Sequence, residues 1–132
     1  TIRAMLFGIL ITFLVQSSSI TTSLVVPLAG AGILKLRQIF PYTLGANIGT
    51  TMTSILASLA TGTIQSLSVA FGHLLFNIFG IVLIWPIPQL RNIPIKLASQ
   101  FAELATQNKV YPFLYIVIVF FIIPLTLISI VR

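Results

Sequence analysis

The sequence contains no cysteine, one acidic residue and one histidine. Without cysteine, a disulfide framework and a thiolate metal site are both excluded. The only histidine, His73, and the only carboxylate side chain, Glu103, lie in different segments. No nucleophile–base pair, carboxylate pair, metal-ligand cluster or phosphate-loop fingerprint is therefore available, and we do not expect an enzyme.

Charge is also scarce, since 6% of the 132 residues are charged and 58% are hydrophobic. A soluble domain carries about 25% charged residues, so this chain has too few to cover a surface that faces water. Three uncharged stretches, 4–34, 38–90 and 110–131, separate the charges. Because about 20 mainly apolar residues cross a bilayer as a helix, the composition predicts an all-α integral membrane protein.

The net charge of +6 raises the question of a nucleic-acid partner. The basic residues flank apolar segments and form no continuous run, so we interpret them as topology signals instead. A cleaved signal peptide at 4–15 is disfavoured, because no small-residue cleavage site follows and the hydrophobicity resumes at once. The chain begins with Thr1, and we expect a fragment or a processed product.

Residues 4–34 predict a re-entrant helical hairpin. The polar cluster Gln16–Ser19 divides two apolar arms of about 12 and 15 residues, each roughly 18–22 Å long as a helix. Neither arm reaches across a hydrocarbon core of about 30 Å. Non-helical backbone at such depth is tolerated only where protein or a wet cavity surrounds it, so the polar tip is expected to be covered.

Lys35–Pro41 is predicted as a short polar connection, and the next segment, 42–61, as an interrupted transmembrane helix. Its middle, Gly45–Thr51, places two glycines around an asparagine, and each glycine costs about 1 kcal/mol against alanine in a helix. We expect the second half to start near Thr50.

Three further helices are expected. A 24-residue span ends in an aromatic interface anchor and prolines. An amphipathic helix then lies at the membrane interface. A final span is kinked by Pro124. In this order, the three helices are 62–85, 93–108 and 110–131.

The distribution of basic residues tests this topology. With the hairpin, six basic residues share one side, and the loops 35–41 and 86–109 are cytoplasmic by the positive-inside rule. If 4–34 crossed fully, the division would be five against two. The hairpin gives the sharper asymmetry, with Arg132 alone opposite Arg3, Lys35, Arg37, Arg91, Lys96 and Lys109.

The two neutral polar clusters, Gln16–Ser19 and Gly45–Thr51, are the candidates for binding. Interrupted helices near the midplane are the usual ion and substrate sites of secondary transporters. Half-helix N–H groups and serine hydroxyls suit an anion, whereas freed carbonyls and hydroxyl oxygens suit a hard cation. The alternatives are hydroxyls bonded to their own backbone and a glycine packing notch at Gly45–Thr51. For His73 and Asn77, one turn apart, interhelical hydrogen bonding is favoured over a proton relay.

Four strings carry a family resemblance: QSSSITTSL (16–24), YTLGANIGTTMTSILASLA (42–60), HLLFNIFGIVLIWPIP (73–88) and FFIIPLT (120–126). In this order they resemble the type II sodium-dependent phosphate cotransporter family, and in particular the second of its two QSSS repeats. The resemblance implies sodium-coupled symport of inorganic phosphate by alternating access, with sodium as the coupling ion and no cofactor. It also implies one half of an inverted-repeat transporter, since the family has two such repeats.

The resemblance also implies a site. Gln16 would orient the tip, and the serines after it would contact phosphate, while the polar residues around the unwound helix would supply oxygens to phosphate or sodium. The division between the two ligands stays open. The phosphate candidates are Gln16, Ser17, Ser18, Ser19, Asn47, Thr50 and Thr51, and the sodium candidates are Thr22, Ser23, Gly45, Asn47 and Thr50.

A second QSSS repeat is the expected protein partner, and a missing N-terminal half is preferred over a second copy. The positive bias on one side would oppose insertion of an inverted copy. Beyond position 132 the family continues with another apolar segment. The expected location is a plasma membrane or bacterial inner membrane, crossed several times. An accessory subunit without transport of its own and an anion channel are the alternatives.

Overall fold

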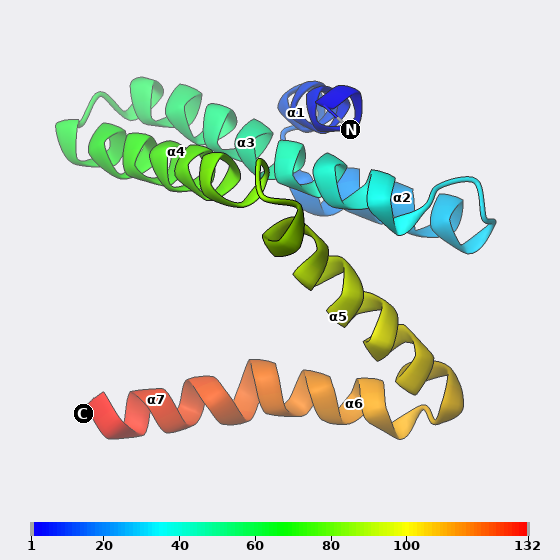
Figure 1. Cartoon of the computed structure of the whole chain (residues 1–132). Coiled ribbons are helices and arrows are strands. Elements are labelled where there is room, and N and C mark those ends of the chain that lie inside the picture. Colours follow the sequence, from blue (N-terminus) through cyan, green and yellow to red (C-terminus); the bar gives the residue numbers. More distant parts are fainter. Residues whose placement is uncertain (1, 132) are drawn as a thin grey trace. The chain divides into compact units, whose positions relative to one another are not determined.

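The computed structural model describes residues 2–131, and all regular structure in this range is helical. The chain divides into two compact units, Thr1–Asn92 and Ile93–Arg132. The first unit holds four complete helices, coloured blue to green in Figure 1. These are α1 (Ile2–Val15), α2 (Ser18–Gly30), α3 (Leu36–Thr61) and α4 (Ile64–Ile84).

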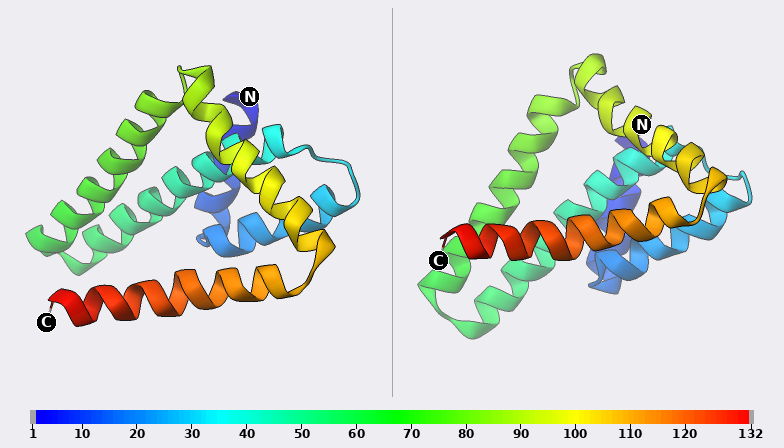
Figure 2. Two further views of the ribbon diagram at one scale, coloured as in Figure 1. Left: turned by 60° about the horizontal axis from the view of Figure 1, so that its bottom comes forward. Right: turned by 90° about the horizontal axis from the view of Figure 1, so that it is seen from below.

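The polar tip is a true break between α1 and α2. Gln16 adopts a left-handed conformation with φ 58°, and its N–H closes α1 on the carbonyl of Thr12 at 2.7 Å. Ser17 is extended, and its Oγ accepts a hydrogen bond from the N–H of Ile20, which caps α2. Figure 2 shows α1 and α2 leaving this turn as an open V.

The predicted interruption at Gly45–Thr51 is wrong, because α3 runs as one continuous helix from Leu36 to Thr61. It also begins earlier than predicted, since most of the expected connection Lys35–Pro41 belongs to its first turns. The backbone N–H of Lys35 donates to Oε1 of Gln38 at 2.9 Å, which stabilises this early start. The structure therefore provides no freed backbone carbonyls in the middle of α3.

The glycines of α3 instead allow α1 to cross it at close range. A Cβ atom on Gly45 would overlap the backbone carbonyl of Met5, and one on Gly8 would overlap that of Tyr42. A Cβ on Gly49 would lie 2.7 Å from the Cβ of Thr12. Small residues let two membrane helices approach closely, so the packing notch explains these glycines.

Helix α3 ends at Gly62, whose φ of 67° is the left-handed conformation that glycine adopts without a steric penalty. Thr63 then caps α4 through its side chain, which accepts from the N–H of Ser66. In both views of Figure 2, α3 and α4 run side by side as an antiparallel pair. The predicted boundary between two helices near residue 62 is thus present.

The second part of the chain contains α5 (Pro88–Gln107), α6 (Val110–Val117), the π-helical turn η1 (Ile118–Ile122) and α7 (Ile123–Val131). The expected interfacial helix therefore starts at Pro88 rather than at residue 93. The π turn directly precedes Pro124, which has no N–H to donate and would clash with the preceding turn of an α-helix. Within the second unit, Phe101 of α5 and Tyr115 of α6 stack with centroids 4.8 Å apart.

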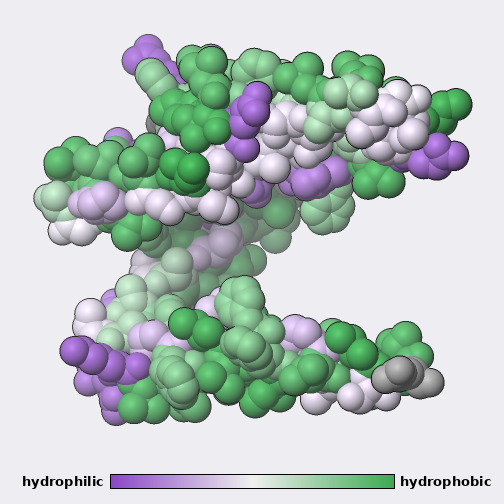
Figure 3. Space-filling model, turned by 180° about the vertical axis from the view of Figure 1, so that it is seen from behind, coloured by the Kyte–Doolittle hydropathy of each residue, from purple (hydrophilic) through white to green (hydrophobic). Residues whose placement is uncertain are grey.

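Two described helical runs are long and apolar enough to cross a membrane, namely Ile64–Ile84 and Val110–Val131. Helices α1 and α2 are apolar but shorter. Figure 3 shows hydrophobic side chains over much of the visible surface, and large exposed ones include Phe76 at 77% and Ile130 at 80%. Such exposure suits a surface that meets lipid or another protein segment, as expected of an all-α membrane protein.

Candidate functional site

The tip Gln16–Ser19 lies beside the first half of α3, which both neighbouring helices contact. On the α1 side, Thr12 is fully buried and lies against Gly49. On the α2 side, the hydroxyl of Tyr42 donates to the carbonyl of Thr21 at 3.2 Å. The structure therefore brings the tip and the α3 segment Gly45–Thr51 into one region of the first unit.

The hydrogen-bond donors of the tip are largely unused. The first N–H groups of a helix have no intrahelical acceptor, which leaves those of Ser18 and Ser19 available. The hydroxyls of these two serines and the side-chain amide of Gln16 form no hydrogen bond with any residue of 2–131. Ser17 uses its oxygen as the cap acceptor and keeps its own O–H free to donate.

The hydroxyls that follow the tip are arranged in the opposite way. Thr22 donates to the carbonyl of Ser18 at 2.7 Å, and Ser23 donates to that of Ser19 at 2.6 Å. Thr21 does the same with the carbonyl of Ser17 at 2.7 Å. The proton of each hydroxyl is thus directed at its own helix, while the oxygen lone pairs stay free to accept.

The candidate residues on α3 also differ in whether their side chains already form hydrogen bonds. Thr50 donates to the carbonyl of Ala46 at 3.1 Å, and Thr51, which is fully buried, donates to that of Ile48 at 2.7 Å. Asn47 is exposed, and its side chain bonds to no residue of the described range. Gly45 is buried beneath α1, and its carbonyl belongs to a continuous helix. Side-chain oxygens are therefore the remaining cation ligands on this segment.

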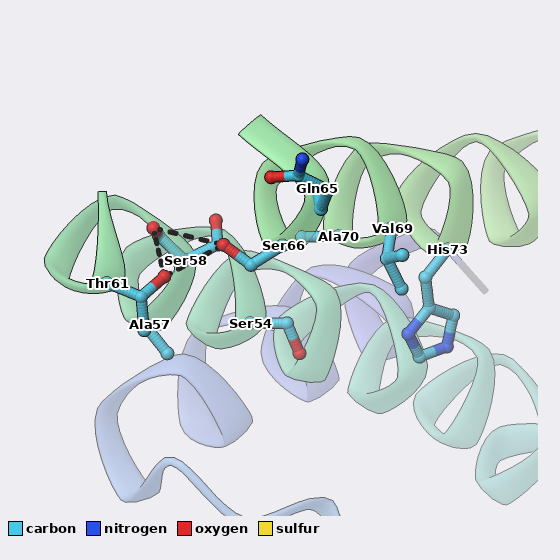
Figure 4. A pocket seen from close by; sticks show the side chains of 9 residues that line it. All are labelled: Ser54, Ala57, Ser58, Thr61, Gln65, Ser66, Val69, Ala70 and His73. Atoms are coloured by element: carbon cyan, nitrogen blue, oxygen red, sulfur yellow. Dashed lines mark hydrogen bonds between the residues drawn. The ribbon is translucent and has the colours of Figure 1, made fainter. Parts of the chain in front are cut away.

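A polar groove that the sequence did not predict as a site lies between α3 and α4. It has a volume of about 540 Å³ and includes Ser54, Ser58, Thr61, Ser66 and His73 in its lining. Figure 4 shows the His73 ring reaching from α4 toward α3, and the hydroxyls of Thr61 and Ser66 meeting near the turn. The available signal was the spacing of hydroxyls along one face of α3.

The helices, their apolar surfaces and the uncharged polar tip define a helical membrane protein with polar groups at the ends of helices. A family model described as Na+/Pi-cotransporter matches residues 1–98. The chain therefore belongs to the sodium–phosphate cotransporter family, which comprises transport proteins and not enzymes, and the resemblance seen in the sequence is confirmed.

Curated relatives agree with this membership. The chain is 45% identical over 125 residues to a bovine protein and 44% identical over 126 residues to a human one, both named sodium-dependent phosphate transport protein 2B. These alignments cover 92% and 93% of the chain but 18% of each relative. A rat protein named sodium-dependent phosphate transport protein 2C is 42% identical over 92% of the chain and 21% of its own length.

The chain thus spans about a fifth of the length of the curated relatives it matches. No solved structure matches it.

Proposed function

We propose that this chain is one repeat of a transporter that couples the symport of inorganic phosphate to sodium by alternating access. The printed names of the relatives, sodium-dependent phosphate transport proteins, support both ligands. The observation that carries the proposal is the separation of free donors at the tip from free acceptors on the helices beside it. An anion requires the former and a cation the latter.

Phosphate is assigned to the tip. The start of α2 offers the N–H groups and hydroxyls of Ser18 and Ser19, together with the O–H of Ser17 and the amide of Gln16. Aligned peptide dipoles add partial positive charge at this end of the helix. The assignment needs no cationic side chain, so phosphate would be held by hydrogen bonds and by the accompanying sodium.

Sodium is assigned to oxygens whose protons are already donated. The hydroxyls of Thr22, Ser23 and Thr50 can ligate a hard cation through their lone pairs, but donating to phosphate would require breaking a bond to the backbone. Asn47 can serve either ligand, because its amide carries both a donor and an acceptor. Sodium is then the coupling ion, and no cofactor is invoked.

A second QSSS repeat would complete the site. One tip presents one helix start, which covers one side of a phosphate, and the turn at Gln16–Ser17 cannot face lipid. An inverted repeat across the membrane plane would supply the other side. We favour an N-terminal half of the same transporter over a second copy of this chain, for the reason of charge given above.

The same proposal includes the membrane arrangement. Residues 4–34 enter and leave on one side, α3 and α4 form a crossing pair, and the segments 35–41 and 86–109, which are largely helical in the structure, are cytoplasmic. The protein would cross a plasma membrane or a bacterial inner membrane several times. The concentration of positive charge in those segments supports this orientation.

Flux through reconstituted vesicles separates the proposal from its two alternatives. The complete transporter carrying this chain should accumulate labelled phosphate when an inward sodium gradient is present, and should lose that accumulation when choline replaces sodium. Equal phosphate flux in sodium and choline would favour an anion channel. Full flux from a transporter that lacks this chain would favour an accessory subunit.

A further inference from the structure

The groove between α3 and α4 begins at the turn that joins these helices and extends to the middle of α4. Thr61 and Ser66 are its lining residues next to the turn, and Ser54 and His73 are its polar lining residues farthest from the turn along the two helices. His73 is the tenth residue of the 21-residue helix α4, which places it close to the centre of a membrane span. An ionisable group at that depth marks a pathway or a site by default.

Hydroxyl groups of Ser54 and Ser58 present acceptors to the groove, whereas Gln65 and His73, which also line it, carry N–H donors as well. Ser54 donates its proton to the carbonyl of Thr50 at 3.0 Å, and Ser58 donates to that of Ile55 at 2.7 Å. Near the turn, the hydroxyls of Thr61 and Ser66 lie 2.8 Å apart and hydrogen-bond to each other, and Ser66 also accepts from the hydroxyl of Thr63. The protons of Ser54 and Ser58 are thus directed at backbone carbonyls, which leaves their oxygen lone pairs for a ligand in the groove.

The register of the two helices carries this polar face toward Thr50, which is one of the proposed sodium ligands. The same number of residues separates Thr61 from Ser54 as separates Ser66 from His73. One further turn on each helix places Asn77 level with Thr50. The Asn77 Nδ2 atom is buried and has no hydrogen-bond partner within residues 2–131. A buried amide of this kind requires a partner such as water or a ligand.

We propose that the α3–α4 groove is a hydrated entry path for sodium, leading from the membrane side opposite the loops 35–41 and 86–109 toward Thr50. The identity of the ion, sodium, rests on the proposed function. The presence of water in the groove does not depend on that function. Hydroxyl oxygens whose protons are already donated favour a hard cation over an anion. The path is thus expected to prefer cations at Ser54 and Ser58 without containing a carboxylate.

Cysteine labelling tests the path, and the chain contains no native cysteine that would interfere. Ser54→Cys and Ala57→Cys place thiols on the groove in an otherwise cysteine-free complete transporter. Both should react with a membrane-impermeant cationic methanethiosulfonate, and several-fold more slowly with an anionic one of similar size. Leu56→Cys is the matched control, because Leu56 lies on the same turn of α3 but is not part of the groove lining.

Three labelling results would contradict the path or its preference for cations. Unreactive thiols at positions 54 and 57 would overturn the path, as would equal reactivity of Leu56→Cys. Equal rates with cationic and anionic reagents would overturn its selectivity for cations. Because labelling is measured without transport, a failed path is distinguishable from a failed assignment of phosphate symport.

A fixed positive charge in the groove provides the second test. His73→Lys should raise the sodium concentration for half-maximal uptake by about tenfold or more, since charges that line a cleft change the local ion concentration by about 10- to 1,000-fold. Uptake is normalised to transporter at the membrane. Unchanged sodium dependence in His73→Lys would refute the path.

Discussion

The close crossing of α1 and α3 at Gly45 leads to a prediction that distinguishes two roles for this residue, a packing notch and a sodium ligand. In the structure this residue is a packing notch, because a Cβ atom there would overlap the backbone carbonyl of Met5. If Gly45 served mainly to ligate sodium through a freed carbonyl, an added methyl group would disturb sodium binding more than folding. Gly45→Ala therefore has opposite consequences under the two interpretations.

The expected magnitude follows from two opposing terms. Alanine is favoured over glycine in a helix by about 1 kcal/mol. Overpacking a close contact costs about 1–3 kcal/mol and sometimes more. Here the obstructing atoms are backbone atoms of Met5, which cannot rotate away, so we expect the upper part of that range. The net loss of unfolding free energy should be about 1–2 kcal/mol or larger.

Matched controls isolate the steric term. At Gly72 and Gly80 of α4, an added Cβ would meet no atom within 4 Å. Gly72→Ala and Gly80→Ala should therefore gain the helix preference without a clash and leave stability equal or higher. The difference between Gly45→Ala and these controls should be about 2–3 kcal/mol, which is the clash alone, because the helix preference is gained at all three positions and cancels.

The assay is thermal unfolding of the complete transporter in detergent, with and without sodium and phosphate. We expect Gly45→Ala to lower the unfolding temperature without ligands, and the shift produced by ligands to stay similar. If Gly45→Ala is as stable as Gly72→Ala while the sodium-dependent shift disappears, the close crossing is wrong and Gly45 acts as a ligand.

Two further predictions concern the tip. Ser18→Ala should weaken phosphate binding about ten- to a hundredfold, since a hydrogen bond to a charged group contributes about 1.5–3 kcal/mol. Thr21→Ala is its control, because that hydroxyl already donates to the Ser17 carbonyl and is assigned to neither ion, and a larger loss there than at Ser18 would contradict the assignment of phosphate to the Ser18 hydroxyl. Single cysteines at Arg3 and Lys35 should be labelled from the same side of the membrane, and labelling from opposite sides would exclude the re-entrant arrangement.

The sequence predicted the break at Gln16–Ser17 because four polar residues interrupt an apolar run, and a local signal of this kind needs no tertiary information. It predicted a break at Gly45–Thr51 by the same logic and was wrong. The propensity cost of two glycines is about 2 kcal/mol, and close packing of α1 against them offsets it. Whether a glycine interrupts a helix or receives a neighbour depends on that neighbour, which local propensity does not include.

The groove was missed for a related reason. Thr50, Ser54, Ser58 and Thr61 follow one face of α3, but each hydroxyl taken alone has a satisfactory explanation in its bond to the backbone. Only the pairing with α4 shows that the same face lines a groove that also contains His73. Hydrogen bonding of each hydroxyl to the backbone is therefore compatible with a role in ion binding. The backbone carbonyl accepts the hydroxyl proton, and the oxygen lone pairs remain available to a ligand.

This division of protons explains how a nearly uncharged segment could handle two ions of opposite sign. A hydroxyl inside a helix donates to a carbonyl of the preceding turn and so becomes an acceptor for the outside. The hydroxyls of Ser18 and Ser19, the first two residues of α2, donate to no carbonyl of residues 2–131 and remain donors. Ser18 and Ser19 are in the first turn of α2, and Thr22 and Ser23 are in the second. Under the proposed assignment, position along the helix would determine which ion each hydroxyl prefers, with phosphate at the tip and sodium at the turns beyond it.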